Sequence, residues 1–146
     1  MSTTAGAGAA KTAARPTTAL FSSLAGLTSL GVLLQGLWAG LFVPTGKGGP
    51  YDDTWVGVHQ WGGLVTLVLG VAAAVVAVVT LRARRDLLIG AIALAVLLVI
   101  EVGLGSAVSD SRSGAAAAVH LPLALVIMSL TVWLPLRARP ARGATA

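Results

Sequence analysis

Four long apolar runs constrain the fold of this chain more than any other feature. They cover about residues 19–43, 56–81, 87–108 and 116–136. With a helical rise of about 1.5 Å per residue, each run can cross a hydrocarbon core about 30 Å thick. Charged residues make up 10% of the sequence, whereas soluble domains carry about 25%. The sequence therefore predicts an all-α membrane protein, in which four transmembrane helices form an antiparallel bundle.

The segments that flank these runs divide the chain into three parts. Residues 1–16 are rich in Ala, Thr and Gly, which predicts a disordered cytoplasmic tail. Residues 17–136 predict the transmembrane domain, and residues 137–146 predict a basic cytoplasmic tail. The first apolar run exceeds the length of about 7–15 residues found in signal peptides, so we interpret it as a membrane span.

The positions of the basic residues predict the orientation in the membrane. Eight of the ten Lys and Arg residues lie before the first run, between the second and third, or after the fourth. Because cytoplasmic loops carry an excess of Lys and Arg, both termini are expected to be cytoplasmic. The exceptions are Lys47 and Arg112. The high content of Ala, Gly, Val, Leu and Arg is typical of a high-GC bacterium, so we expect a multi-pass protein of a bacterial plasma membrane.

Several classes of function are excluded by what the sequence lacks. The chain has no cysteine, which excludes disulfides, iron–sulfur clusters and thiol catalysis. The net charge is +5, and the basic residues lie mainly at the ends of the apolar runs, where membrane topology explains them. The sequence has no basic patch with interleaved aromatic residues, which a nucleic-acid-binding protein would carry. No hydrolase triad, phosphate-binding loop or HExxH motif is present.

One arrangement occurs in each half of the chain: a polar residue lies within one apolar run, and a histidine lies near the beginning of the next run. Gln35 precedes His59, and Glu101 precedes His120; these are the only two histidines, and Glu101 is the only glutamate. Each histidine follows a valine and opens an even-numbered run. The pattern predicts a weak parallel repeat of two helical hairpins, related by a pseudo-two-fold axis along the membrane normal.

Polar groups at these positions need partners or a function, because an unpaired polar group in hydrocarbon is costly. Counted from the cytoplasmic span ends, Glu101 lies at about 22 Å, and His120 and Gln35 at about 25 Å. His59 lies at about 34 Å, a mismatch of about 9 Å. All four residues are therefore expected in the outer half of the bundle, with His59 nearest the outer surface.

We interpret the two histidines as the axial ligands of one haem iron, which is a common cofactor in the core of a four-helix bundle. Gln35 and Glu101 would tune the haem pocket or relay protons. Nearby small residues would let a macrocycle lie close to the helices, or would equally permit close helix packing: Gly57, Gly62, Gly63, Gly103, Gly105 and Ala124.

Other interpretations of these residues stay open. Each histidine is also typical of a solvated helix end, and Gln35 of a hydrogen bond between helices. Glu101 is expected to be protonated, paired with His120 or Gln35, or exposed to a water-filled pocket. Asp52 and Asp53 indicate a solvated loop, with a metal site beside His59 as the alternative.

Two prolines predict the limits of the fourth helix. Pro122 is expected in its first turn, where a missing N–H is tolerated. Pro135 is expected to mark its end.

The second hairpin resembles the third and fourth helices of one half of haem A synthase. The residues that carry this resemblance are Ile100-Glu101-x-Gly103-Leu104-Gly105 and Val119-His120-Leu121-x-Leu123-Ala124. In that family each four-helix half carries a histidine pair, whose places match His59 and His120. The chain has Glu101 where the family usually has Gln, and Val56 where the substrate half has Glu. The resemblance therefore implies the half that holds a haem b. The chain also resembles small four-helix membrane proteins of high-GC bacteria.

These observations lead to three hypotheses about function. The first is an integral membrane haem b-binding protein that transfers electrons or serves as a subunit of a respiratory or oxidase complex, and is not an enzyme on its own. The second is a cofactor-free accessory subunit. The third is a small proton-coupled transporter or an extracytoplasmic metal site. The expected partners are the lipid bilayer and either other membrane subunits or a second copy of the chain.

Overall fold

The computed structural model describes residues 16–42 and 52–139, which form four α-helices. They are α1 (Pro16–Phe42), α2 (Asp53–Thr80), α3 (Arg85–Ser111) and α4 (Gly114–Ala138). All four are long and apolar enough to cross a membrane. The prediction of an all-helical chain with four candidate spans is therefore confirmed. The predicted tails lie mostly outside the described residues, but residues 137 and 138 belong to α4 and not to a tail.

Short polar side chains begin the second and fourth helices. Asp52 precedes α2, and its Oδ1 accepts hydrogen bonds from the backbone N–H groups of Thr54 at 2.9 Å and Trp55 at 3.3 Å. Ser113 caps α4 in the same way, because its Oγ accepts from the N–H of Ala116 at 3.2 Å. Asp52 is thus an N-cap residue, which satisfies N–H groups that have no partner within the helix.

The prediction for the two prolines was wrong. The fourth helix begins at Gly114, so Pro122 lies in its interior rather than in its first turn. Pro135 is also internal, because α4 continues to Ala138. A proline has no N–H to donate to the carbonyl four residues earlier, and membrane helices tolerate this loss when neighbouring groups compensate. The predicted run began at residue 116, two residues after the observed start of α4 at Gly114, so Pro122 already lay beyond the first turn of that run.

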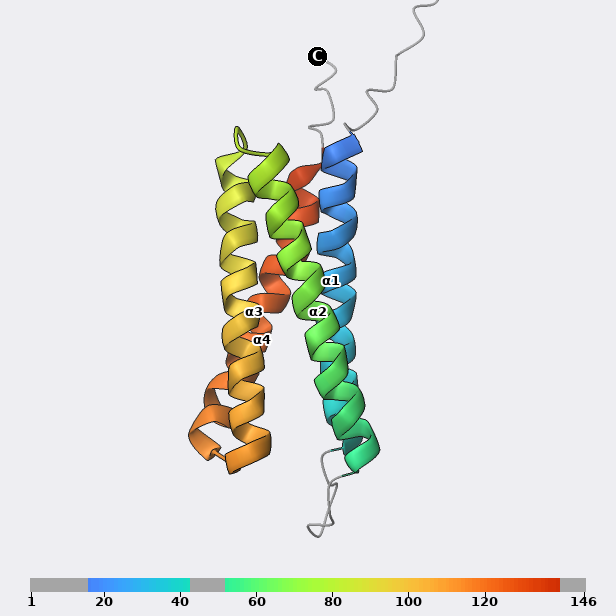
Figure 1. Cartoon of the computed structure of the whole chain (residues 1–146), viewed down its shortest axis with the longest axis vertical. Helices are drawn as coiled ribbons and strands as arrows, with labels where there is room; N and C mark the ends of the chain where they lie inside the picture. The colour runs from blue at the N-terminus through green and yellow to red at the C-terminus, as the bar shows by residue number, and fades with distance from the viewer. Residues whose placement is uncertain (1–15, 43–51, 140–146) are drawn as a thin grey trace, which may run out of the picture.

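The helices form a ring in which each contacts two neighbours. The contacting pairs are α1 with α2, α2 with α3, α3 with α4, and α1 with α4. Among the described residues, the backbones of α2 and α4 do not approach each other, so these two helices lie across a diagonal of the ring. Figure 1 shows α1 and α2 diverging from α3 and α4 toward the end where α2 begins.

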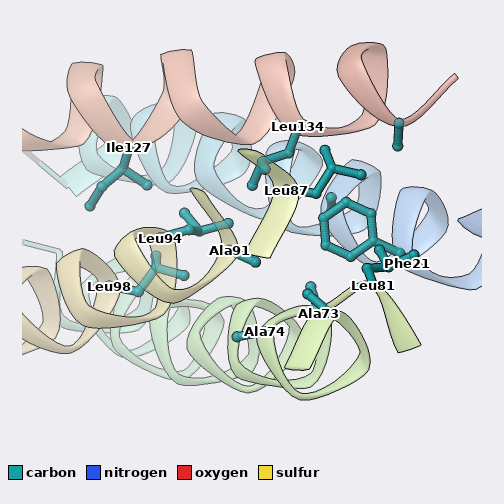
Figure 2. Packing of buried hydrophobic residues seen from close by; sticks show 13 residues of the cluster. Phe21, Ala73, Ala74, Leu81, Leu87, Ala91, Leu94, Leu98, Ile127 and Leu134 are labelled. Atoms are coloured by element: carbon teal, nitrogen blue, oxygen red, sulfur yellow. The ribbon is translucent and has the colours of Figure 1, made fainter. Parts of the chain in front are cut away.

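The hydrophobic core lies at the opposite end of the bundle (Figure 2). It joins Phe21 near the beginning of α1, Leu81 just after α2, Leu87 near the beginning of α3, and Leu134 near the end of α4. Small residues on α2 and α3 let the helices approach closely; they include Ala73, Ala77 and Ala91, all fully buried. Dispersion contacts between these side chains hold the four helices together at this end.

An ion-pair cluster closes the same end. Asp86 at the beginning of α3 pairs with Arg84 at 3.2 Å and with Arg137 of α4 at 2.9 Å. Arg84 also donates a hydrogen bond to the carbonyl of Arg137 at 3.0 Å. The connection between α2 and α3 is thereby tied to the end of α4.

The distribution of buried residues divides the bundle into two halves. The packed half comprises residues 16–31, 66–98 and 127–139, and it contains the whole core cluster. The histidine half comprises residues 32–42, 53–65 and 99–126. Among the described residues of the histidine half, only Ala116 is buried. The core therefore fills one half of the bundle and not the other.

Candidate functional site

The two histidines meet inside the histidine half. His59 lies on α2 and His120 on α4, the two helices that face each other across the diagonal of the ring. Their ring centroids are 6.4 Å apart, and the ring planes are inclined by 74°. The backbones of α2 and α4 are not in contact, but these two side chains meet in the space between them.

The depth mismatch predicted for His59 was wrong. Counting residues from the span ends placed His59 about 9 Å beyond His120, yet the two rings lie within contact distance of each other. Helix tilt explains much of the difference, because a tilted helix advances less along the membrane normal per residue. Figure 1 shows α2 inclined relative to α3.

Two residues of α1 contact the imidazole of His59. Its Nδ1 lies 3.1 Å from the backbone carbonyl oxygen of Gln35. The ring of Phe42 packs edge-on against the imidazole, with the centroids 5.3 Å apart. A carbonyl only accepts hydrogen bonds, so a hydrogen bond to Gln35 forms when Nδ1 carries the hydrogen, and in the neutral ring Nε2 is then unprotonated.

The side chain of Gln35 bridges one turn of α2. In the orientation that satisfies its hydrogen bonds, its amide nitrogen donates to the carbonyl of His59 at 2.8 Å, and its oxygen accepts from the N–H of Gly63 at 2.9 Å. The amide nitrogen also lies 3.0 Å from Nδ1 of His59, which would accept from it only in the other tautomer. If Nε2 of His59 binds a metal, it carries no hydrogen, and Nδ1–H then donates to the Gln35 carbonyl.

A glycine permits this approach of α1 to α2. A Cβ atom added at Gly62 would collide with the ring of Trp38 and the amide of Gln35. The sequence left two roles open for Gly62, contact with a macrocycle or close helix packing, and its surroundings in the structure are those of close helix packing.

Glu101 pairs with His120. Glu101 Oε1 lies 3.2 Å from Nδ1 of His120, and the side chains are 14% and 21% exposed. The angles of this contact are not those of a hydrogen bond. Nδ1 and the second carboxylate oxygen, Oε2, therefore have no hydrogen-bond partner among the described residues. Of the alternatives open for Glu101, the structure has the pairing with His120.

Gly105 brings the ring of His120 against α3. A Cβ atom at Gly105 would lie 3.4 Å from Cε1 of His120, so α3 comes within van der Waals distance of the imidazole. Near the same end, Gln60 of α2 donates a hydrogen bond to the hydroxyl of Ser109 on α3 at 3.4 Å. Sequence reasoning missed this link, because polar residues near span ends are ordinary and neither belongs to the repeated pattern.

The separation of the two rings is compatible with both binding one metal ion. Because metal–imidazole bonds are about 2.0 Å long and ring nitrogens lie about 1.1 Å from the ring centre, two imidazoles on opposite sides of one metal would have centroids about 6.2 Å apart. The observed separation is 6.4 Å. No group of three or more His, Asp or Glu side chains able to hold a metal ion occurs in the described part of the chain. Asp52, Asp53 and His59 are thus not gathered into such a group in the described part of the chain.

Comparisons with protein-family models, with curated proteins and with solved structures find no match to this chain. The resemblance to haem A synthase thus stays a prediction from the residues that carry it.

Proposed function

We propose that this chain is an integral membrane protein that holds one haem b between His59 and His120. Its role is electron transfer, or service as a subunit of a respiratory or oxidase complex. The observation that carries the proposal is the 6.4 Å separation of two imidazole rings across the diagonal of the bundle. It is supported by the histidine half, whose interior is not filled by buried side chains.

Each residue of the site has a part in this proposal. His59 and His120 would hold the haem iron through Nε2, and a bound haem b would supply one-electron redox chemistry. The Gln35 carbonyl and the Glu101 carboxylate lie beside the Nδ1 atoms, which leaves Nε2 of each ring as the nitrogen available to a metal. Gly105 lets the ring of His120 lie against α3.

The membrane orientation belongs to the same proposal. The excess of Lys and Arg at the end of the packed half places both termini in the bacterial cytoplasm and the histidine half toward the outer surface. The haem would then exchange electrons near the outer face of the membrane. Other membrane subunits or a second copy of the chain are the expected partners.

An oxidised-minus-reduced absorption spectrum of the protein, purified after expression with sufficient haem, tests the proposal. The wild type is expected to show a b-type spectrum, and His59→Ala and His120→Ala are each expected to abolish or shift it. Trp61→Ala is the matched control, because Trp61 lies two residues from His59 but is 72% exposed. It should leave the spectrum unchanged.

A flat spectrum from folded wild-type protein would contradict the proposal. The polar residues would then act as hydrogen-bonding links between helices, and a cofactor-free accessory subunit would replace the haem protein as the explanation.

A further inference from the structure

The two histidines have chemically different partners at equivalent places in the two hairpins. The Nδ1 atom of His59 faces the neutral backbone carbonyl of Gln35 at 3.1 Å. The Nδ1 atom of His120 faces the carboxylate of Glu101 at 3.2 Å. The repeat that places both histidines therefore puts an acidic group beside only one of them.

The negative charge of the Glu101 carboxylate has few stabilising partners inside the bundle. The Glu101 side chain is 14% exposed, and Oε2 has no hydrogen-bond partner among the described residues. Within that same part of the chain, its only ion-pair partner is His120. A carboxylate in a low-dielectric interior is stabilised strongly by nearby positive charge. The arrangement therefore favours a cationic centre on the far side of the imidazole.

We propose that Glu101 is a positioning residue that lowers the reduction potential of the haem held by His59 and His120. The inference rests on the proposed function. The Glu101 carboxylate lies 3.2 Å from Nδ1 of His120, and a carboxylate beside the outer nitrogen of a ligating histidine makes the imidazole a stronger electron donor. Its negative charge also stabilises the ferric iron, which carries one more positive charge than the ferrous iron. Both effects favour the oxidised state.

Glu101→Gln removes the charge and keeps the size and shape of the side chain. The glutamine oxygen takes the place of Oε1, 3.2 Å from Nδ1 of His120, so the ring keeps its neighbour while the charge is lost. We expect haem binding and the b-type spectrum to persist. The ferrous-to-ferric ratio at a fixed ambient potential should rise about tenfold, equivalent to about 59 mV for one electron.

Two further variants define the effect. Asp110→Asn is the matched control, since it removes a carboxylate from the exposed end of the same helix, where water and salt screen the charge. It should change the ratio less than twofold. Glu101→Asp keeps the charge but withdraws it by one methylene, so its potential should lie between those of the wild type and Glu101→Gln.

Redox titration of the haem-loaded proteins decides the outcome. If the wild type binds haem and Glu101→Gln has the same reduction potential, this inference is overturned and the proposed function stands. If Glu101→Gln does not retain haem, Glu101→Asp decides, and a potential equal to that of the wild type would overturn the inference. Wild-type protein without haem would overturn both proposals.

Discussion

The packed half and the histidine half are built from the same four helices, yet they differ in what fills them. Large apolar side chains from α1, α3 and α4 fill the packed half, and α2 contributes small buried residues; the large ones include Phe21, Leu87, Leu94, Ile127 and Leu134. In the histidine half, polar side chains and two imidazoles occupy the interior, and Ala116 is the only buried residue among those described. Lipid provides no hydrophobic force between helices, so close packing must hold them together. The packing that stabilises the bundle is therefore concentrated in one half.

The largest effect should come from a cavity in the packed half. Leu94 is fully buried, and Leu94→Ala is expected to lower the free energy of unfolding by about 2–5 kcal/mol, because contacts are lost and a void remains. The control is Leu125→Ala in the histidine half, whose side chain is 71% exposed and should change stability by less than about 0.5 kcal/mol. Unfolding in mixed micelles measures both. Equal losses would mean that the two halves do not differ as described.

Haem loading should change the histidine half selectively. At a free haem concentration about 100 times the dissociation constant, binding stabilises the bound state by about 2.7 kcal/mol. Amide hydrogen exchange should then slow at residues 53–65 and 99–126 and change little at residues 70–98. Slowing confined to residues 70–98 would place the ligand elsewhere.

Adding one methyl group to α1 should have opposite effects in the two halves. A Cβ atom at Gly31 would collide with Thr66 of α2, so Gly31→Ala is expected to destabilise the protein by about 1–3 kcal/mol. At Gly36 nothing lies within 4 Å, and Gly36→Ala should stabilise α1 by up to about 1 kcal/mol through helix propensity. Thermal aggregation in detergent would rank the two variants. A tolerated Gly31→Ala would show that α1 and α2 can separate at this level.

The smallest effect concerns the link between Gln60 and Ser109. The contact is long and exposed, and hydrogen bonds between membrane helices contribute about 0.6 kcal/mol on average. Ser109→Ala should therefore lower stability by about that amount, as measured by unfolding in mixed micelles. Ser106→Ala is the control, because its hydroxyl bonds only to the carbonyl of Val102 within the same helix. A much larger loss in Ser109→Ala would show that the histidine half contributes substantially to stability.

The four helices could be predicted from the sequence, but the position of the core could not. Apolar length identified each span without any knowledge of packing. The apolar residues form continuous runs, so no periodicity distinguished Leu94, which is buried, from Val99, which is 56% exposed. Which residues face lipid depends on how the helices pack, and that is set by small residues on neighbouring helices.

The residues proposed for the site could be singled out from the sequence, but their arrangement in space could not be predicted. Polar residues in apolar runs are conspicuous, which is why Gln35, His59, Glu101 and His120 could be identified. The pairing of Glu101 with His120 was one of several alternatives, and the bridge from Gln35 to α2 was not predicted. Counting residues from the span ends gave the wrong depth for His59. The count assumes that each helix is parallel to the membrane normal and that all helices begin at the same depth.

The ion-pair cluster of Arg84, Asp86 and Arg137 has a consequence for the biogenesis of the protein. It joins the connection between the hairpins to the last turn of α4, beside a core that is complete without a ligand. The chain can therefore insert and assemble in the membrane before any prosthetic group arrives. If the proposed haem is bound, its incorporation is a late step, and an empty but assembled pool of protein should accumulate when haem synthesis is limiting.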